Sequence, residues 1–251
     1  MRSLWLIARR EFAAYWTSPV AYVVFAVFLI ITGLFFFGSL SGFVNASTRS
    51  GGQGVDVNQQ VIRPYLNSVS VILLFILPLV SMRLLAEEKR QGTLEILLTT
   101  PLSEASLVGG KYLASLGLFA VLLLAPAAHT AVLFVFGNPE WSQVLTGFLG
   151  LFLTGAAYLS LGLFLSGVTQ NQVVAAVLAF ALFLGLWLAY SLGQFAQGVL
   201  AAVLTAVSFT GHFHNFARGI LDTSDLIFYL SLISAGLFGA VQAVLSTRWK
   251  S

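Results

Sequence analysis

The sequence of 251 residues contains no cysteine, and charged residues make up only 8% of it. Without cysteine the fold has no disulfide bond, no thiolate metal site and no cysteine nucleophile. A soluble globular domain carries about 25% charged residues, so an ordinary soluble domain is excluded. The net charge is +3, but the few cations do not form a basic face, which argues against nucleic acid as a partner.

Motifs for catalysis are also missing from the sequence. Gly110-Lys111 is the nearest match to a phosphate-binding loop, but position 105 is Ala and position 112 is Tyr, so the first glycine and the Ser/Thr metal ligand are absent. There is no zinc-protease His-Glu-x-x-His motif and no Gly-x-Ser-x-Gly nucleophile turn. We therefore expect no enzyme activity and no bound cofactor in this chain.

Apolar residues dominate instead, at 58% of the chain, with 22 phenylalanines and 23 glycines. Crossing a bilayer takes roughly 20 mostly apolar residues in a helix. Runs of that kind, with Arg83 and Lys111 near their ends as the only charged residues, cover Val20–Phe43, Leu66–Leu85, Leu107–Phe136, Val144–Val168, Val173–Gly193 and Leu226–Ser246. Because the runs do not alternate with a period of two, a β-barrel is disfavoured. The sequence predicts an all-α membrane protein with six transmembrane helices, and the runs contain no acidic residue of the kind that a proton relay uses.

Lysine and arginine are distributed unequally between the two sides of these spans. Nine cations fall on the side of the termini, namely Arg2, Arg9, Arg10, Arg83, Lys89, Arg90, Lys111, Arg248 and Lys250. Three fall on the other side, Arg49, Arg63 and Arg218. Cytoplasmic loops are enriched in these residues, so both termini are expected in the cytoplasm, and the glycine-rich connection Asn45–Arg63 is expected to be a flexible outer loop.

Residues 1–18 precede the first span and have amphipathic spacing. Their apolar stripe consists of Leu4, Trp5, Ala8, Phe12, Tyr15 and Trp16. This pattern predicts a helix lying in the cytoplasmic membrane interface. A plain membrane anchor and an element with a role in coupling explain the pattern equally well.

Residues 194–222 form a second segment outside the spans. The apolar patch Val199–Phe209 is too short to cross, so we expect a re-entrant or interfacial helical pair on the outer side. His212 and His214 follow it, and a His-x-His pair can bind copper or zinc. No third ligand is evident nearby, so hydrogen bonding is the preferred interpretation, and an intramembrane metal enzyme is the alternative.

The cytoplasmic connection between the second and third spans, residues 86–104, is dense in charge and contains Glu87–Glu95 followed by Leu97–Pro101. Gly92 is expected to break the helix that leaves the second span, Thr93 or Thr99 could cap a further helix, and Pro101 would stop it. A solvated loop would explain the charges but not the combination of a helix-breaking glycine, a capping threonine and a terminating proline. The pattern favours a short amphipathic helix that docks a soluble partner.

The run Ala86–Ser103 with Gly110-Lys111-Tyr112 resembles the signature of ABC-2 type transporter permeases. Within them the chain is most similar to the gliding-motility and multicopper-enzyme-maturation subgroup. The likeness covers nearly the whole chain and includes Arg10-Glu11-Phe12, the turn Ser166–Gln172 and the late segment His212–Leu226.

This resemblance implies a dimer of two permeases above two separate ATPase subunits, which bind the ATP and magnesium. It also implies a bacterial inner-membrane location and, in this subgroup, an extracytoplasmic auxiliary subunit. The positions that correspond to the ATPase-docking motif are Arg10, Glu11, Glu88, Gly92, Thr93 and Glu95. The alternative function is a non-transporting scaffold that transmits ATPase-driven motion to an outer protein.

Small residues recur at four-residue spacing in two of the spans and allow helices to approach closely. The pairs are Gly38/Gly42, Ala235/Gly239 and Gly236/Ala240. They fit a seam between two permeases or packing inside one chain, and the resemblance favours a seam at the first span and the outer part of the fifth.

Overall fold

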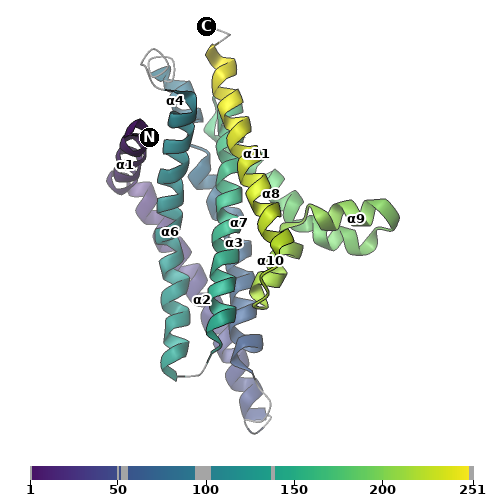
Figure 1. The fold of residues 1–251 in the computed structure, drawn as a ribbon. Coiled ribbons are helices and arrows are strands. Elements are labelled where there is room, and N and C mark those ends of the chain that lie inside the picture. The colour runs from purple at the N-terminus through teal and green to yellow at the C-terminus, as the bar shows by residue number, and fades with distance from the viewer. Residues whose placement is uncertain (1, 50, 52–55, 94–102, 137–138, 249–251) are drawn as a thin grey trace.

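The computed structural model describes residues 2–49, 51, 56–93, 103–136 and 139–248. All regular elements in that part of the chain are helices (Figure 1). They are α1 (Arg2–Thr17), α2 (Pro19–Arg49), the π-helix η1 (Asn58–Ile62), α3 (Arg63–Ser81), α4 (Ala86–Gln91), α6 (Glu104–Phe136), α7 (Trp141–Val168), α8 (Gln172–Phe195), α9 (Gly198–Ala206), α10 (Phe209–Ala217) and α11 (Thr223–Arg248).

Six of the helical segments are long and apolar enough to cross a membrane, which confirms the predicted all-α fold with six spans. They cover Ala21–Arg49, Asn58–Gln91, Glu104–Val135, Trp141–Val168, Gln172–Phe195 and Thr223–Ser246. Each contains the greater part of one apolar run. The helices are longer than the runs because the backbone continues its hydrogen bonding into polar residues at both ends.

The predicted flexible outer loop Asn45–Arg63 is mostly helical where the structure describes it, so this expectation is wrong. Helix α2 continues to Arg49, with the Thr48 hydroxyl donating to the Val44 carbonyl oxygen at 2.8 Å. The next span begins with η1, where the Asp56 carboxylate accepts from the Asn58 N–H at 2.9 Å. At the start of the second helix, Asp56 accepts from an N–H that has no partner inside the helix, which favours a helix start there.

Helix α7 forms the centre of the bundle and packs against α3, α6, α8, α10 and α11. Its small residues permit this. A Cβ at Gly155 would overlap the Phe119 ring, and a Cβ at Gly150 would overlap Phe216. On α11, a Cβ at Gly236 would come within 2.7 Å of the Ser160 carbonyl carbon. The Gly236/Ala240 pair therefore packs α11 against α7 inside one chain.

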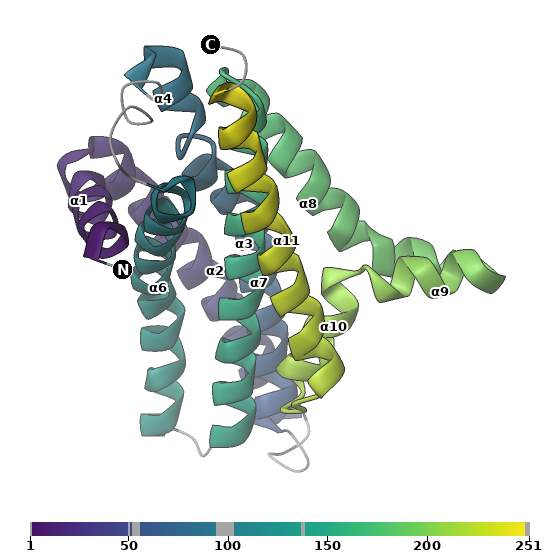
Figure 2. The same cartoon turned by 45° about the horizontal axis from the view of Figure 1, so that its top comes forward.

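The two ends of the bundle differ in what they carry (Figure 1). At the termini end lie α1, α4, the α7–α8 turn and the last turn of α11. At the opposite end lie η1, the end of α6 and the start of α7, with α10 beside the first turn of α11. Figure 2 shows α1 beside the termini end of α6, and α8 leading into α9 away from the bundle.

Residues 194–222 include two short helices, α9 and α10, after α8 has continued to Phe195. No residue of α9 is buried, whereas α10 buries Phe209, Phe213 and Phe216 against the bundle. How deep either helix lies in a membrane, as a re-entrant or an interfacial element, stays a prediction.

Candidate functional site

Helix α4 is attached to the end of α7 by one hydroxyl group. The Ser166 oxygen accepts from the Leu85 N–H at 3.0 Å and from the Ala86 N–H at 2.9 Å, and it donates to the Met82 carbonyl oxygen at 3.0 Å. The first N–H groups of a helix have no partner inside it, so Ser166 provides a cap from another element. The Lys89 ammonium adds a hydrogen bond to the Gly167 carbonyl oxygen. These hydrogen bonds attach α4 to the end of α7, so a displacement of one helix would displace the other.

Gly92 ends α4 in the left-handed conformation, with a φ of +69°. Its N–H donates to the Lys89 carbonyl oxygen at 3.3 Å. Glycine adopts this conformation without the steric cost that a Cβ brings, so the predicted break at Gly92 is confirmed. The chain turns out of α4 at this point, and Thr93 follows with its hydroxyl 3.4 Å from the Glu88 carbonyl oxygen.

Helix α1 packs on α6 at positions where α6 lacks large side chains. A Cβ at Gly110 would lie 2.7 Å from the Ile7 side chain and 3.1 Å from the Leu4 carbonyl oxygen. One at Gly117, two turns further along, would lie 3.1 Å from the Phe12 ring. The two helices therefore touch along the length of α1, which fixes α1 against the bundle.

Lys111, directly after Gly110, is 3% exposed and joins three helices through its ammonium group. Its Nζ lies 2.9 Å from Glu88 Oε1 on α4 and 3.5 Å from Glu11 Oε2 on α1. The other Glu88 oxygen is buried and has no hydrogen-bond partner. We call Glu11, Lys111 and Glu88 the Lys111 bridge. Because the ammonium is almost completely removed from water, its two carboxylates are the main compensation for burying its charge.

The predicted docking positions are divided between this bridge and the surface. Glu11 and Glu88 meet at Lys111, and Arg10 pairs with the other oxygen of Glu11 at 3.1 Å while staying exposed. Gly92 is exposed and Thr93 is partly buried at the end of α4. Glu95 lies outside the described residues.

Two residues of this arrangement, Lys111 and Ser166, were not predicted. In the sequence, Lys111 stands in the nearest match to a phosphate-binding loop, a motif that the chain does not complete. Its position at the start of a long apolar run is a signal, because a lysine that is buried there needs a carboxylate partner. No local pattern marks Ser166, which acts on residues about 80 positions earlier in the chain.

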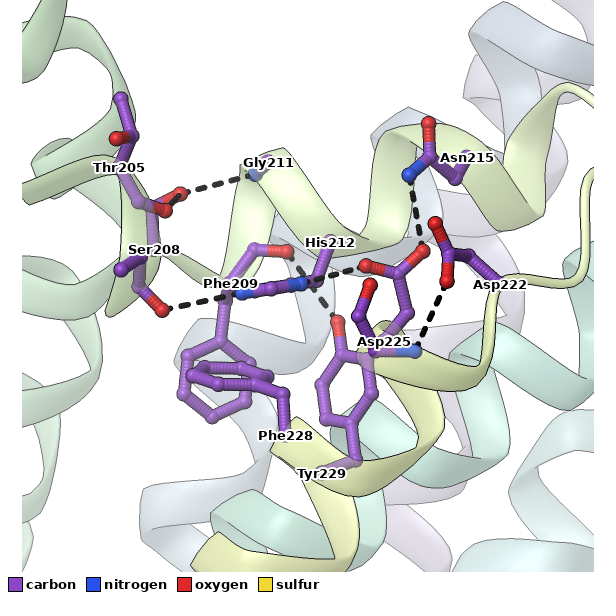
Figure 3. A network of polar contacts seen from close by, with 12 residues as sticks. Thr205, Ser208, Phe209, Gly211, His212, Asn215, Asp222, Asp225, Phe228 and Tyr229 are labelled. Atoms are coloured by element: carbon purple, nitrogen blue, oxygen red, sulfur yellow. Dashed lines mark hydrogen bonds and ion pairs between the residues drawn. The ribbon is translucent and has the colours of Figure 1, made fainter. Parts of the chain in front are cut away.

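The opposite end holds a second polar network, in which α10 is joined to α11 (Figure 3). Asp225 is 2% exposed, and its two oxygens lie 2.6 Å from His212 Nδ1 and 2.9 Å from Asn215 Nδ2. His212 Nε2 lies 3.1 Å from the Ala206 carbonyl oxygen, and the ring stacks on Phe228. Each ring nitrogen of His212 therefore faces an oxygen atom of the protein, the Asp225 carboxyl on one side and the Ala206 carbonyl on the other.

His214 makes a different contact, with Nε2 2.9 Å from the Arg63 guanidinium. A guanidinium only donates, so this nitrogen accepts and the ring is neutral. Burial first, and then the charges of Arg218 and Arg63, lower the pKa of His214. The nitrogens of the two histidines thus face separate protein partners. Among the described residues, no three or more His, Asp or Glu side chains gather as a metal site.

The six apolar helices, with a charged helix held at one end, define a polytopic helical membrane protein. The family described as ABC-2 family transporter protein matches residues 5–247. The chain therefore belongs to the ABC-2 family of transporter membrane proteins. Proteins of this family are permeases that lack a catalytic ATPase domain and work with an ATPase partner. Comparison with curated proteins gives no match.

Proposed function

We propose that this chain is the permease subunit that couples ATP hydrolysis by a separate subunit to export or to work on the outer side. The ATPase docks on α4, on the residues that follow it and on α1. The observation that supports this most directly is the Lys111 bridge. It links both proposed docking helices to α6, a membrane span, through one buried ammonium.

A docking helix transmits motion only if its contacts with the bundle are stiff. Helix α4 has three such contacts: the Ser166 cap on α7, the hydrogen bond from Lys89 to Gly167, and Glu88 on Lys111. A ligand shifts an equilibrium only through contacts that differ between states. Movement of α4 by an ATPase would have to carry α7 and α6 with it or break these contacts.

The charge asymmetry supports the orientation that this function needs. The termini end carries most of the lysines and arginines, so we place it, together with α1 and α4, in the cytoplasm of a bacterial cell. The proposal also includes two permeases in each complex, by resemblance. The gliding-motility subgroup and an outer auxiliary protein are finer proposals that rest on the late segment alone.

The experiment is copurification of the ATPase with the tagged chain, followed by ATPase stimulation in nanodiscs. Gly92→Ala places a Cβ in a conformation that costs about 1 kcal/mol, and Glu95→Ala removes a predicted docking carboxylate. Each variant should leave the permease inserted and should reduce copurification or stimulation several-fold.

Gly51→Ala is the control for Gly92→Ala, because both glycines have a positive φ and no other atom within 4 Å of the added Cβ. Gly51 follows α2 at the opposite end of the bundle, away from the proposed docking surface. Glu140→Gln, at the exposed opposite end, is the control for Glu95→Ala. Wild-type copurification and stimulation in both test variants would place docking elsewhere, with Arg10 and Glu11 on α1 as the next candidates.

A further inference from the structure

A cleft of about 200 Å³ opens at the termini end between α1 and α2 on one side and α3 and α6 on the other. Apolar side chains cover most of its wall, among them Val24, Val80, Leu118 and Leu122. Its charged lining residues are Glu11 on α1, Arg83 after the end of α3 and Lys111 in the first part of α6, all toward the termini end. The cleft is therefore amphipathic along its length.

The cleft exists because α1 packs against α6 and does not cover the neighbouring part of α3. Helix α1 follows the glycines of α6, while the chain turns at Ser18 into α2. Apart from Tyr15, the residues that face the space from this corner are small, namely Ala14, Ser18 and Ala21. The space stays open, so a separate molecule can enter it.

The charges at the polar end leave one cation available. Both Glu11 oxygens are engaged, by Arg10 and by Lys111, and Lys111 also holds Glu88. Arg83 is exposed and has no hydrogen bond or ion pair in the part of the chain that the structure describes. Burial, with the charge of Glu11 second, raises the pKa of Tyr15, so its hydroxyl stays protonated. The polar end thus favours an anion.

Aromatic side chains beside the cleft mark the depth of the membrane interface. The Tyr22 hydroxyl donates to the Trp16 carbonyl oxygen at 3.0 Å, and the two rings pack edge to face. Rings of this kind concentrate at the level of lipid headgroups. From Lys111 the wall continues along α6 to Leu122, about 16 Å deeper at 1.5 Å per residue. The polar end therefore lies at headgroup depth and the apolar wall at acyl-chain depth.

From this geometry we infer that the cleft binds one anionic phospholipid from the leaflet at the termini end. Its phosphate contacts the Arg83 guanidinium, and one acyl chain lies along the apolar wall between α2 and α3. Basic pockets between membrane helices on the cytoplasmic side bind anionic headgroups in this way. The bound lipid would support α1 on the side where the bundle leaves it uncovered. This inference does not depend on ATPase docking.

Native mass spectrometry of the full chain can test it. Delipidated protein is equilibrated in nanodiscs with equal amounts of phosphatidylglycerol and phosphatidylcholine, released into detergent, and the retained lipids are counted. We expect one phosphatidylglycerol per chain, selected over phosphatidylcholine. Arg83→Gln should weaken retention about tenfold, because a charge-assisted hydrogen bond is lost. Arg83→Lys should retain most of it.

Arg49→Gln is the matched control, since Arg49 is also an exposed arginine but lies at the opposite end. Ala21→Phe fills the apolar wall and should abolish retention; if it does not fold, the arginine series decides alone. Wild-type retention of phosphatidylglycerol in Arg83→Gln would overturn the inference. So would displacement by millimolar glycerol 3-phosphate, which would indicate a site for phosphate alone, or the absence of retained lipid from the wild type.

Discussion

Lys111 on α6 holds Glu88 on α4 at 2.9 Å, although 23 positions and the whole connection between two spans separate them in the sequence. Glu88 was predicted to face a partner protein, but its carboxylate points toward the bundle and is 15% exposed. The proposed docking surface would then be helix α4 as a whole and not the Glu88 side chain itself. Glu88 would transmit its motion to α6 through Lys111.

A double-mutant cycle on this pair gives the first prediction. Lys111→Met leaves two carboxylates close together without their cation, at a cost on the order of 3 kcal/mol. Glu88→Gln leaves Lys111 with Glu11 only. The double variant strands neither charge, so its loss of thermal stability in detergent should be smaller than the sum of the single losses.

Coupling between the ATPase and the permease should also be impaired in these variants. ATPase stimulation in nanodiscs should fall in each single variant of the pair. Arg49→Gln is the control, because it removes an exposed charge at the opposite end of the bundle, away from α4 and α1. Additive losses across the cycle would mean that the two side chains act independently, against the bridge.

The second prediction concerns the cap on α4. Ser166→Ala removes the acceptor of the Leu85 and Ala86 N–H groups, which are buried. Each orphaned donor costs about 1–3 kcal/mol, so α4 should detach locally. We expect faster hydrogen exchange at residues 84–91 and weaker ATPase stimulation.

Ser160→Ala is the matched control for the cap. Ser160 is also on α7 and fully buried, but its hydroxyl only donates to the Ala157 carbonyl within the helix. Its loss leaves no N–H without a partner. Unchanged exchange at residues 84–91 in Ser166→Ala would contradict the assigned role of Ser166.

The spans were predictable from the sequence because a run of apolar residues in lipid has to be helical. The break at Gly92 was predictable for a similarly local reason. The prediction for the outer connection fails at its polar ends, residues 45–49 and 57–63, which are helical, because polar residues next to a transmembrane helix can continue its backbone hydrogen bonding. The Lys111 bridge and the Ser166 cap depend on which helices become neighbours, and spacing along the chain does not contain that information.

The third prediction concerns the proposed dimer. Gly38 and Gly42 on α2 have no other atom within 4 Å of an added Cβ, and a shallow hollow lies beside Gly38. If α2 lies at the seam, Gly38→Leu should reduce the dimer fraction in native mass spectra while the single chain stays folded. Ala120→Leu, on the exposed face of α6, is the control. An unchanged dimer in Gly38→Leu would move the seam away from this part of α2.

The last prediction is a pH dependence at the opposite end, carried by His214. Its folded-state pKa lies below the ordinary value of about 6.5, because burial and the charges of Arg218 and Arg63 disfavour the imidazolium. The unfolded chain therefore takes up the proton first. Its contribution to stability is complete above pH 6.5 and is lost as the pH falls from there toward the folded-state pKa.

Protonation also removes the Nε2 acceptor that Arg63 uses at 2.9 Å, so α10 should loosen from the start of α3. The melting temperature in detergent should fall between pH 7 and pH 5 in the wild type. In His214→Gln, which keeps an acceptor but does not titrate, it should fall less. Other groups titrate equally in both proteins, so the difference between the two curves isolates His214. Parallel curves would mean that the Arg63–His214 contact does not contribute to stability.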